Sequence, residues 1–179
     1  MALTDNPICK LELRIERIWA MPNKNTFEIE PIKNLLKEEM TGTQWIDPFA
    51  KDSKLAEWRN DINPNTKAEY HLEANDFLSK FKRESIDGGL LDWVYSPRQL
   101  KECYDSIGIP VTGLDTSAKT WRVWRESMAR VIKPGGKVIT FGWSSAGIGM
   151  KYGFQLYRIL IVPHGGMHND TIVTCEIKA

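Results

Sequence analysis

The sequence has few of the features that mark membrane or secreted proteins. No apolar run approaches the ~20 residues that a transmembrane helix needs, so we expect no contact with a membrane. The segment 1–22 lacks a long apolar stretch, which predicts that there is no signal peptide. The cysteines Cys9, Cys103 and Cys175 are far apart and form no disulfide framework. Together these absences predict a cytoplasmic protein with reduced thiols.

The sequence also lacks a strong charge of either sign. Lysine and arginine total 24 against 23 for aspartate and glutamate, which gives a formal net charge of +1. Such a balance neither excludes nor indicates a nucleic-acid partner, which would need a local basic patch. No GxxxxGK[ST] motif is present, which argues against an ATPase. With 179 residues, 42% of them apolar, we expect one domain over 1–179, in which 1–42 forms an N-terminal extension and a helix leading into the sheet.

Segments typical of strands alternate with segments typical of helices. Apolar residues at helical spacing, with proline near the start and glycine near the end, predict helices at 29–40, 68–81, 96–108 and 118–136. The segment 51–61 offers two helical turns at most. Strands are expected at 43–50, 88–95, 137–143, 155–163 and 170–178. This order predicts an α/β fold with a mostly parallel sheet and an antiparallel terminal hairpin.

Acidic residues follow several of the expected strands. In an open parallel sheet, ligands bind beyond the carboxyl ends of the strands. The acids near these ends are Asp47, Asp61, Asp76 and Asp92. Carboxylates accept hydrogen bonds from amino and hydroxyl groups and repel phosphates, so this pattern favours a nucleoside over a triphosphate.

Three motifs resemble those of a known enzyme family. "IDPFA" resembles the first motif of class I methyltransferases that depend on S-adenosylmethionine (SAM), and "ARVIKPGGKVITF" resembles their helix-turn-strand before the terminal hairpin. "DWVYSPRQ" resembles the DPPY motif of DNA amino-methyltransferases, and most of the chain, from 17 to 173, is similar to small phage-type adenine-specific enzymes. The resemblance implies a Rossmann-like fold, SAM as cofactor and DNA as partner. It also implies methyl transfer to an exocyclic amino group, with adenine N6 as the first candidate.

The resemblance also implies roles for single residues. In the family, the motif's aspartate and a main-chain carbonyl accept the two amino hydrogens, which turns the nitrogen lone pair toward the methyl group. Asp92 would be that acceptor, Trp93 would supply the carbonyl, and Tyr95 would stack on the base. The residues expected at the cofactor are Asp47, Pro48, Phe49, Asp61, Asp76 and Phe77. Those expected at the substrate are Ser96, Pro97, Arg98 and Lys101, with the last two binding phosphate.

The chain departs from the family pattern at two places. Trp93-Val94 replaces Pro-Pro, which removes the stiffness of two prolines and places a large ring at the base pocket. Lys51 stands where close approach to SAM favours glycine. These departures leave a second hypothesis open, in which the fold is kept without catalysis and binds SAM, a nucleotide, nucleic acid or a protein. A third hypothesis keeps catalysis but directs it to RNA or a small amine.

Simpler interpretations of the same residues remain open. Asp92 and Tyr95 fit an ordinary strand exit, Asp47 fits a turn, and Asp61 and Asp76 fit solvated acids or helix caps. His164 and His168 suggest a metal site, but the two glycines between them favour a hairpin turn, so we expect no metal. No separate recognition domain is visible, which suggests a homodimer or a protein partner.

Overall fold

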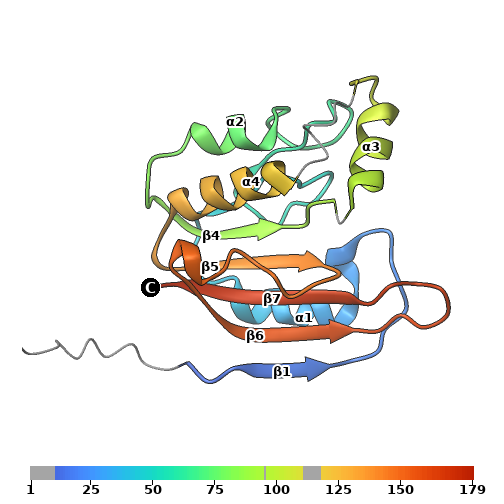
Figure 1. The fold of residues 1–179 in the computed structure, drawn as a ribbon, viewed down its shortest axis with the longest axis vertical. Coiled ribbons are helices and arrows are strands. Elements are labelled where there is room, and N and C mark those ends of the chain that lie inside the picture. Colours follow the sequence, from blue (N-terminus) through green and yellow to red (C-terminus); the bar gives the residue numbers. More distant parts are fainter. Residues whose placement is uncertain (1–10, 95, 111–117) are drawn as a thin grey trace, which may run out of the picture.

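The sheet has seven strands, in the order β1-β6-β7-β5-β4-β2-β3 (Figure 1). The structure is a computed structural model that describes residues 11–94, 96–110 and 118–179. Its strands are β1 (Arg14–Arg17), β2 (Trp45–Asp47), β3 (Trp58–Arg59), β4 (Ile86–Leu91), β5 (Ile132–Gly142), β6 (Phe154–Val162) and β7 (Thr171–Lys178). Only β7 runs antiparallel to its neighbours, and the other paired strands are parallel. The expected α/β class with a terminal hairpin is therefore confirmed.

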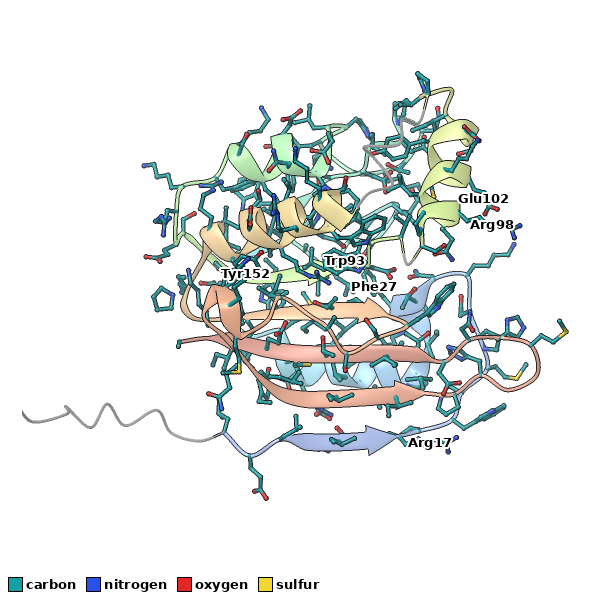
Figure 2. The ribbon with its side chains drawn as sticks, viewed as in Figure 1. Arg17, Phe27, Trp93, Arg98, Glu102 and Tyr152 are labelled. Carbon is teal, nitrogen blue, oxygen red and sulfur yellow. The ribbon has the colours of Figure 1, made fainter. Side chains whose placement is uncertain are left out.

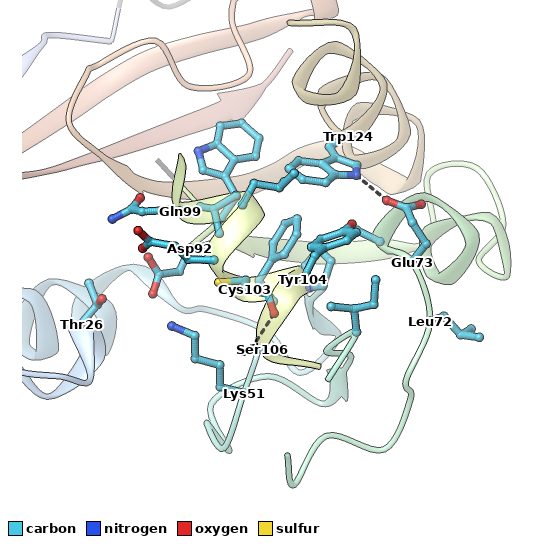
Figure 3. Close-up of a pocket in the computed structure, with 18 residues that line it drawn as sticks. Thr26, Lys51, Leu72, Glu73, Asp92, Gln99, Cys103, Tyr104, Ser106 and Trp124 are labelled. Atoms are coloured by element: carbon cyan, nitrogen blue, oxygen red, sulfur yellow. Dashed lines mark hydrogen bonds between the residues drawn. The ribbon is translucent and has the colours of Figure 1, made fainter. Parts of the chain in front are cut away.

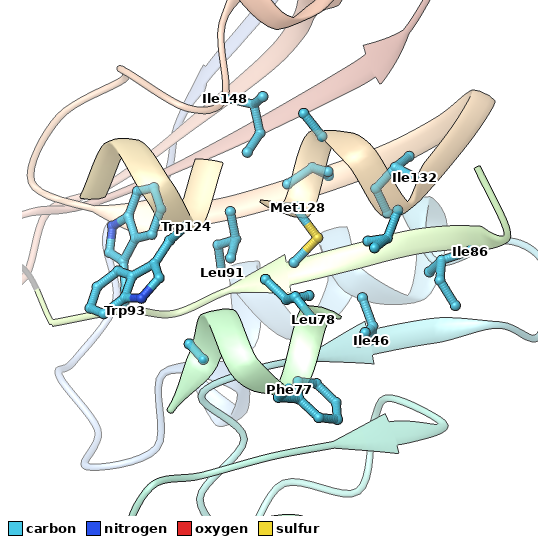
Figure 4. Packing of buried hydrophobic residues seen from close by; sticks show 14 of the residues in the cluster. Ile46, Phe77, Leu78, Ile86, Leu91, Trp93, Trp124, Met128, Ile132 and Ile148 are labelled. Atoms are coloured by element: carbon cyan, nitrogen blue, oxygen red, sulfur yellow. The ribbon is translucent and has the colours of Figure 1, made fainter. Parts of the chain in front are cut away.

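Helices cover the sheet on both faces, with α1 behind it and α2 and α4 in front (Figure 1). The helices are α1 (Glu30–Glu39), α2 (Ala74–Ser79), α3 (Pro97–Ser106) and α4 (Ala118–Val131), with short 3-10 turns η1 (Thr26–Glu28) and η2 (Met150–Tyr152). Adjacent strand residues point to opposite faces, so Leu91 packs beneath α2 and α4 while Leu90 packs against α1. Figure 4 shows the first of these two cores, built around Leu78, Leu91 and Met128.

Local sequence signals set several element ends. Ser96 caps α3 by accepting a hydrogen bond from the backbone N–H of Gln99, and Pro97 occupies the first turn. The chain leaves α1 and α3 through Gly42 and Gly108, at φ of 82° and 72°. The predicted helices at 29–40 and 96–108 are thus confirmed close to their expected bounds.

Some expected bounds are wrong. The segment 51–61 contains no helix: it holds turns and then β3, whose Trp58 and Arg59 pair with β2. Lys51 adopts a positive φ there, a conformation that a right-handed helix excludes. Strand β4 ends at Leu91, so Asp92 to Val94 lie in the loop beyond it. Strand β5 begins at Ile132 directly after α4, and a register shift against β4 accommodates the segment 133–136.

A buried ion cluster links the edge strand β1 and the helix α1 to β6. The guanidinium of Arg158 on β6 donates to Glu16 at 2.7 Å, to Glu38 at 2.7 Å and to Glu39 at 2.9 Å. Lys137 also donates to Glu39, at 2.9 Å. Because the charges are paired and hydrogen-bonded, the burial of Arg158 at 5% exposure is tolerated. In the described part of the chain, no helix is long and apolar enough to cross a membrane.

Candidate functional site

The loops after β2 and β4 meet over a cavity of about 430 Å³ at the carboxyl edge of the sheet (Figure 3). Pro48, Phe49 and Lys51 line it from the β2 side, and Asp92, Trp93 and Val94 line it from the β4 side. Helix α3 forms another wall through Gln99, Leu100, Glu102, Cys103, Tyr104 and Ser106. The rest of the lining is Thr26, Ile62, Leu72, Glu73, Ala74 and Trp124. The structure therefore brings together four of the predicted site residues, Pro48, Phe49, Asp92 and Trp93, at one cavity.

Asn60 fixes the loops around this cavity. Its side chain is fully buried, and its Nδ2 donates to the carbonyls of Pro48 and Leu72, both at 3.0 Å. Its Oδ1 accepts from the backbone N–H of Leu72 at 2.9 Å. One amide thus joins the loop after β2, the end of β3 and the segment before α2. Sequence reasoning missed Asn60, because its role depends on partners twelve residues away.

Asp47 is buried at the end of β2 with one oxygen unsatisfied. Its Oδ1 accepts from the backbone N–H of Phe49 at 3.0 Å, whereas its Oδ2 has no hydrogen-bond partner among the described residues. Burial raises the pKa of Asp47 to about 8, and the nearby carboxylates of Asp92 and Asp61 add to the rise. As its fully buried side chain suggests, Asp47 is not among the residues that line the cavity, although its neighbours Pro48 and Phe49 are.

Asp61 organises the loop after β3. Its Oδ2 accepts from the backbone N–H of Lys51 at 3.0 Å and its Oδ1 accepts from that of Asn63 at 2.9 Å. Asp61 is not among the residues that line the cavity, although its neighbour Ile62 is. Its observed contacts hold the cavity wall in place.

Trp93 separates the main cavity from a second one of about 230 Å³. Its ring is 7% exposed, stacks on Trp124 with centroids 6.4 Å apart, and lies under the guanidinium of Arg125 at 5.2 Å. The second cavity is also lined by Trp121, Arg125, Thr140, Phe141, Gly142, Trp143, Ser144, Ala146 and Gly147. The hydroxyl of Thr140 is buried there without a hydrogen-bond partner among the described residues. Tyr95, the expected stacking ring, lies outside the described residues.

The expected phosphate-binding groups lie on the outer side of α3. Arg98 pairs with Glu102 at 2.8 Å with its side chain 88% exposed, and Lys101 pairs with Asp105 (Figure 2). Neither Arg98 nor Lys101 lines the cavity, and neither do Ser96 and Pro97. The face of α3 toward the cavity carries Gln99 and Cys103, and burial raises the pKa of the Cys103 thiol.

Asp76 and Phe77 lie on α2 away from the cavity. Asp76 is exposed, and Phe77 is fully buried in the core beneath α2 and α4. The acid that does reach the cavity from this segment is Glu73, which accepts from Trp124 Nε1 at 2.7 Å and from the backbone N–H of Asn75 at 2.6 Å. Sequence reasoning missed Glu73, although it precedes the helix at a cap position.

Both ring nitrogens of His164 lie within hydrogen-bond distance of other residues of the fold. Its Nδ1 lies 2.9 Å from the carbonyl of Ala20 and its Nε2 lies 2.8 Å from the hydroxyl of Thr171. The glycines between the two histidines, Gly165 and Gly166, have φ of 71° and 60°, and they form a turn within the loop that joins β6 to β7. Within the described ranges, no three His, Cys, Asp or Glu side chains gather in a way that could hold a metal ion.

No protein-family model and no curated protein matches the sequence. Solved structures do match the fold. TrmN from Thermus thermophilus aligns with a TM-score of 0.56 and 15% identity over 84% of this chain and 49% of its own. A proposed hemolysin from Lactococcus lactis aligns with a TM-score of 0.52 and 11% identity over 83% of this chain and 85% of its own. A third match, at a TM-score of 0.49, is a Burkholderia thailandensis 1,6-didemethyltoxoflavin N1-methyltransferase with S-adenosylhomocysteine bound, at 10% identity over 75% of this chain and 70% of that one.

This chain spans about half the length of the TrmN chain that it matches. At such low identity the likeness concerns the fold. Three features of the structure agree with this match of the folds: the strand order, the single antiparallel strand β7 and the helices on both faces of the sheet. The chain therefore has the Rossmann-like fold of class I methyltransferases.

Proposed function

We propose that this protein is a SAM-dependent methyltransferase that acts on an exocyclic amino group, with adenine N6 of DNA as its target. The observation that carries the proposal is the placement of Asp92 beside a cavity at the carboxyl edge of the sheet, next to the buried, half-satisfied carboxylate of Asp47. Strands β2 and β4 are adjacent and parallel, so both acids reach the same edge. Ligands of this fold class bind at that edge.

The cavity fits the proposed cofactor in size and charge. Its volume of about 430 Å³ lies in the range of small-molecule sites. Phe49, Leu72 and Trp124 offer apolar contacts for a purine ring, and acidic side chains outnumber the single lysine of the lining. SAM carries an ammonium and a sulfonium, so an acidic cavity suits it. Its chemical contribution is an electrophilic methyl group.

The residues of the chain would then position the cofactor and the acceptor. Asp47, which is fully buried and does not line the cavity, would act through the lining residue Phe49, from whose backbone N–H it accepts a hydrogen bond. Asp92 would accept a hydrogen of the acceptor amino group and orient the nitrogen lone pair, and the carbonyl of Trp93 would accept the second hydrogen. Asp61 would act through the loop it holds, because its observed partners are the backbone N–H groups of Lys51 and Asn63.

The second cavity would accept the aromatic ring of the substrate. Trp93, Trp121 and Trp143 present indole surfaces to it, and stacking on aromatic side chains is how extruded bases are held. The unpartnered hydroxyl of Thr140 can donate to or accept from a polar edge of that ring. A DNA substrate would also need phosphate contacts. For Arg98 and Lys101 on α3 to bind phosphate, each would have to break its exposed ion pair. Arg98 pairs with Glu102, and Lys101 pairs with Asp105.

The second candidate function is binding without catalysis. It is favoured by the packing of Trp93, which fills the space between the two cavities through its contacts with Trp124 and Arg125. The exposed Lys51 at the cavity supports it too. On this alternative SAM or a nucleotide binds, but no acceptor reaches Asp92.

Titration calorimetry with SAM and S-adenosylhomocysteine, followed by tritiated methyl transfer, distinguishes these functions. The proposal expects micromolar binding that weakens in Asp47→Ala. It also expects transfer to unmethylated DNA, recovered as N6-methyladenine, that is lost in Asp92→Asn while SAM binding remains. Asp170→Asn is the matched control, since this exposed acid lines neither cavity.

Each other outcome has its own meaning. Binding without transfer to DNA, RNA or a small amine would support the non-catalytic function. Transfer to RNA or an amine alone would keep the enzyme and change its substrate. The absence of SAM binding would overturn the methyltransferase proposal.

A further inference from the structure

Strand β1 forms one edge of the sheet and its outer side is open. It pairs in parallel with β6, from Arg14 opposite Arg158 to Arg17 opposite Ile161. In the part of the chain that the structure describes, no strand pairs with its other side. Figure 1 shows β1 at the edge of the molecule, far from α2 and α4. An open edge is a template for pairing with another chain.

The free backbone groups of β1 belong to alternate residues. Ile18 and Ala20 donate their N–H groups to the carbonyls of Ile161 and Pro163 in and beyond β6, at 3.0 and 3.2 Å. Backbone groups along a parallel strand alternate in direction, so those of Ile15 and Arg17 point outward. The open edge of β1 therefore offers the backbone groups of Ile15 and Arg17.

An apolar stripe follows this edge on the face opposite α1. Glu16 points toward Arg158 and α1, so the alternate residues Leu13 and Ile15 lie on the other face. The large apolar side chains exposed along this segment are Leu11, Leu13, Ile15, Ile18, Trp19 and Met21, with Ile15 at 60%. By alternation all of these except Ile18 lie on the face of Ile15. The neighbouring Ile159 and Ile161 on β6 extend the stripe and are only partly buried. The described helices leave this part of the sheet uncovered (Figure 1).

The charges of β1 complement a second copy of themselves. When two identical strands pair antiparallel about a two-fold axis at Ile15, each Arg14 lies opposite the other copy's Glu16. Ile15 then meets Ile15, Leu11 meets Trp19, and Leu13 meets the apolar stem of Arg17. Charged side chains usually protect an edge by repelling a like edge. Arg14 already pairs with Glu16 of its own chain at 2.8 Å, so the two Arg14–Glu16 pairs meet across the axis with opposite signs adjacent and do not repel each other.

We propose that β1 is the interface of a two-fold symmetric homodimer, in which the sheets of two chains join edge to edge through antiparallel pairing centred on Ile15. The free backbone groups and the apolar stripe allow this pairing, and the alternating charges of Arg14 and Glu16 select its register. This interface does not depend on the methyltransferase proposal, and its test does not require activity.

Sedimentation equilibrium of the full chain tests the interface. The expected result is a mass twice that of one chain, with a dissociation constant raised at least about tenfold by Ile15→Lys, which places like charges together at the axis. Met150→Lys is the matched control, since Met150 is 86% exposed and lies in η2, away from β1. Arg14→Glu is a second variant, expected to weaken the dimer and to do so most at low salt.

Three outcomes would overturn the proposal. A wild-type chain that stays monomeric at its highest soluble concentration shows that the edge does not self-associate. A dimer that persists unchanged in both Ile15→Lys and Arg14→Glu is built on another surface. If Met150→Lys weakens the dimer as strongly as Ile15→Lys does, the effect of Ile15→Lys is not specific to β1. Circular dichroism of each variant confirms that the fold is intact.

Discussion

The backbone N–H of Lys51 donates to Oδ2 of Asp61 at 3.0 Å while Lys51 itself holds a φ of 49°. This contact joins the loops after β2 and β3 at the wall of the cavity. A positive φ is unfavourable for a residue with a Cβ, by about 1–2 kcal/mol in the left-handed region. The position where the family pattern favours glycine therefore has the backbone conformation that favours glycine, although a lysine occupies it.

Lys51→Gly is expected to stabilise the protein. It removes the strain of the left-handed backbone and keeps the N–H that Asp61 accepts, while glycine adds some entropy to the unfolded chain. The net gain in the free energy of unfolding should be about 0.5–1 kcal/mol, measured by urea denaturation. Lys51→Ala is the control: it removes the same side chain but keeps the Cβ, so it should show none of this gain. Equal stabilisation by both variants would show that backbone strain is not the cause.

Asp47 is expected to make stability fall as pH rises from about 4 to about 8. Its pKa is raised from 3.8 to about 8 by burial, so between these values the folded protein holds a proton that the unfolded chain releases. The free energy of unfolding therefore decreases with rising pH, by at most about 1.4 kcal/mol per pH unit from this group. Asp47→Asn should remove this slope, because the amide keeps the acceptor for Phe49 N–H without titrating.

Urea unfolding at a series of pH values measures that slope. Asp170→Asn serves as the control, because this side chain is exposed and its replacement should leave the wild-type slope in place. If wild type and Asp47→Asn lose stability in parallel over this pH range, Asp47 does not carry the raised pKa.

The sequence alone predicts most of the architecture. Proline at the start and glycine after the end delimit α1 and α3, and the β-branched runs become β5, β6 and β7. The placement of Asp47 and Asp92 at one edge follows from the parallel order of β2 and β4. These features depend on local chemistry and on strand direction, which a sequence contains.

Features that depend on distant partners could not be predicted. Asn60 and Glu73 matter because of residues twelve and 51 positions away, Leu72 and Trp124. The family resemblance implies that Phe77 lies at the cofactor, but the helix face it occupies points into the core. The segment 51–61 has helical composition, whereas pairing of β3 with β2 decides its structure.

Arg158→Ala is expected to destabilise the protein by about 3 kcal/mol or more. The substitution leaves the carboxylates of Glu16 and Glu39 without their main partner next to a buried strand. Arg122→Ala removes an arginine from an exposed pair with Glu126 and should cost less than about 0.5 kcal/mol. The measurement is the urea-unfolding free energy of both variants. A similar small loss in both would show that the cluster contributes little to stability.

The tryptophan in the loop after β4 complicates the restoration of the family's Pro-Pro sequence. Trp93 is buried against Trp124 and Arg125, so Trp93→Pro should cost about 3–5 kcal/mol from lost packing. A Trp93→Pro/Val94→Pro variant without activity would therefore not distinguish a damaged fold from a non-catalytic site. The two positions have to be tested separately.

Val94→Pro alone is expected to raise the rate of methyl transfer, by about tenfold at most, with little loss of stability. Val94 is half-buried, and its N–H has no hydrogen-bond partner among the described residues. A proline keeps the carbonyl toward which Trp121 Nε1 donates at 3.4 Å, and it holds the preceding Trp93 in an extended conformation that aims its own carbonyl. Val94→Ala is the control, since it shortens the side chain without stiffening the backbone. A folded Val94→Pro variant that binds SAM and transfers no methyl group, like the wild type, would favour the binding function over the catalytic one.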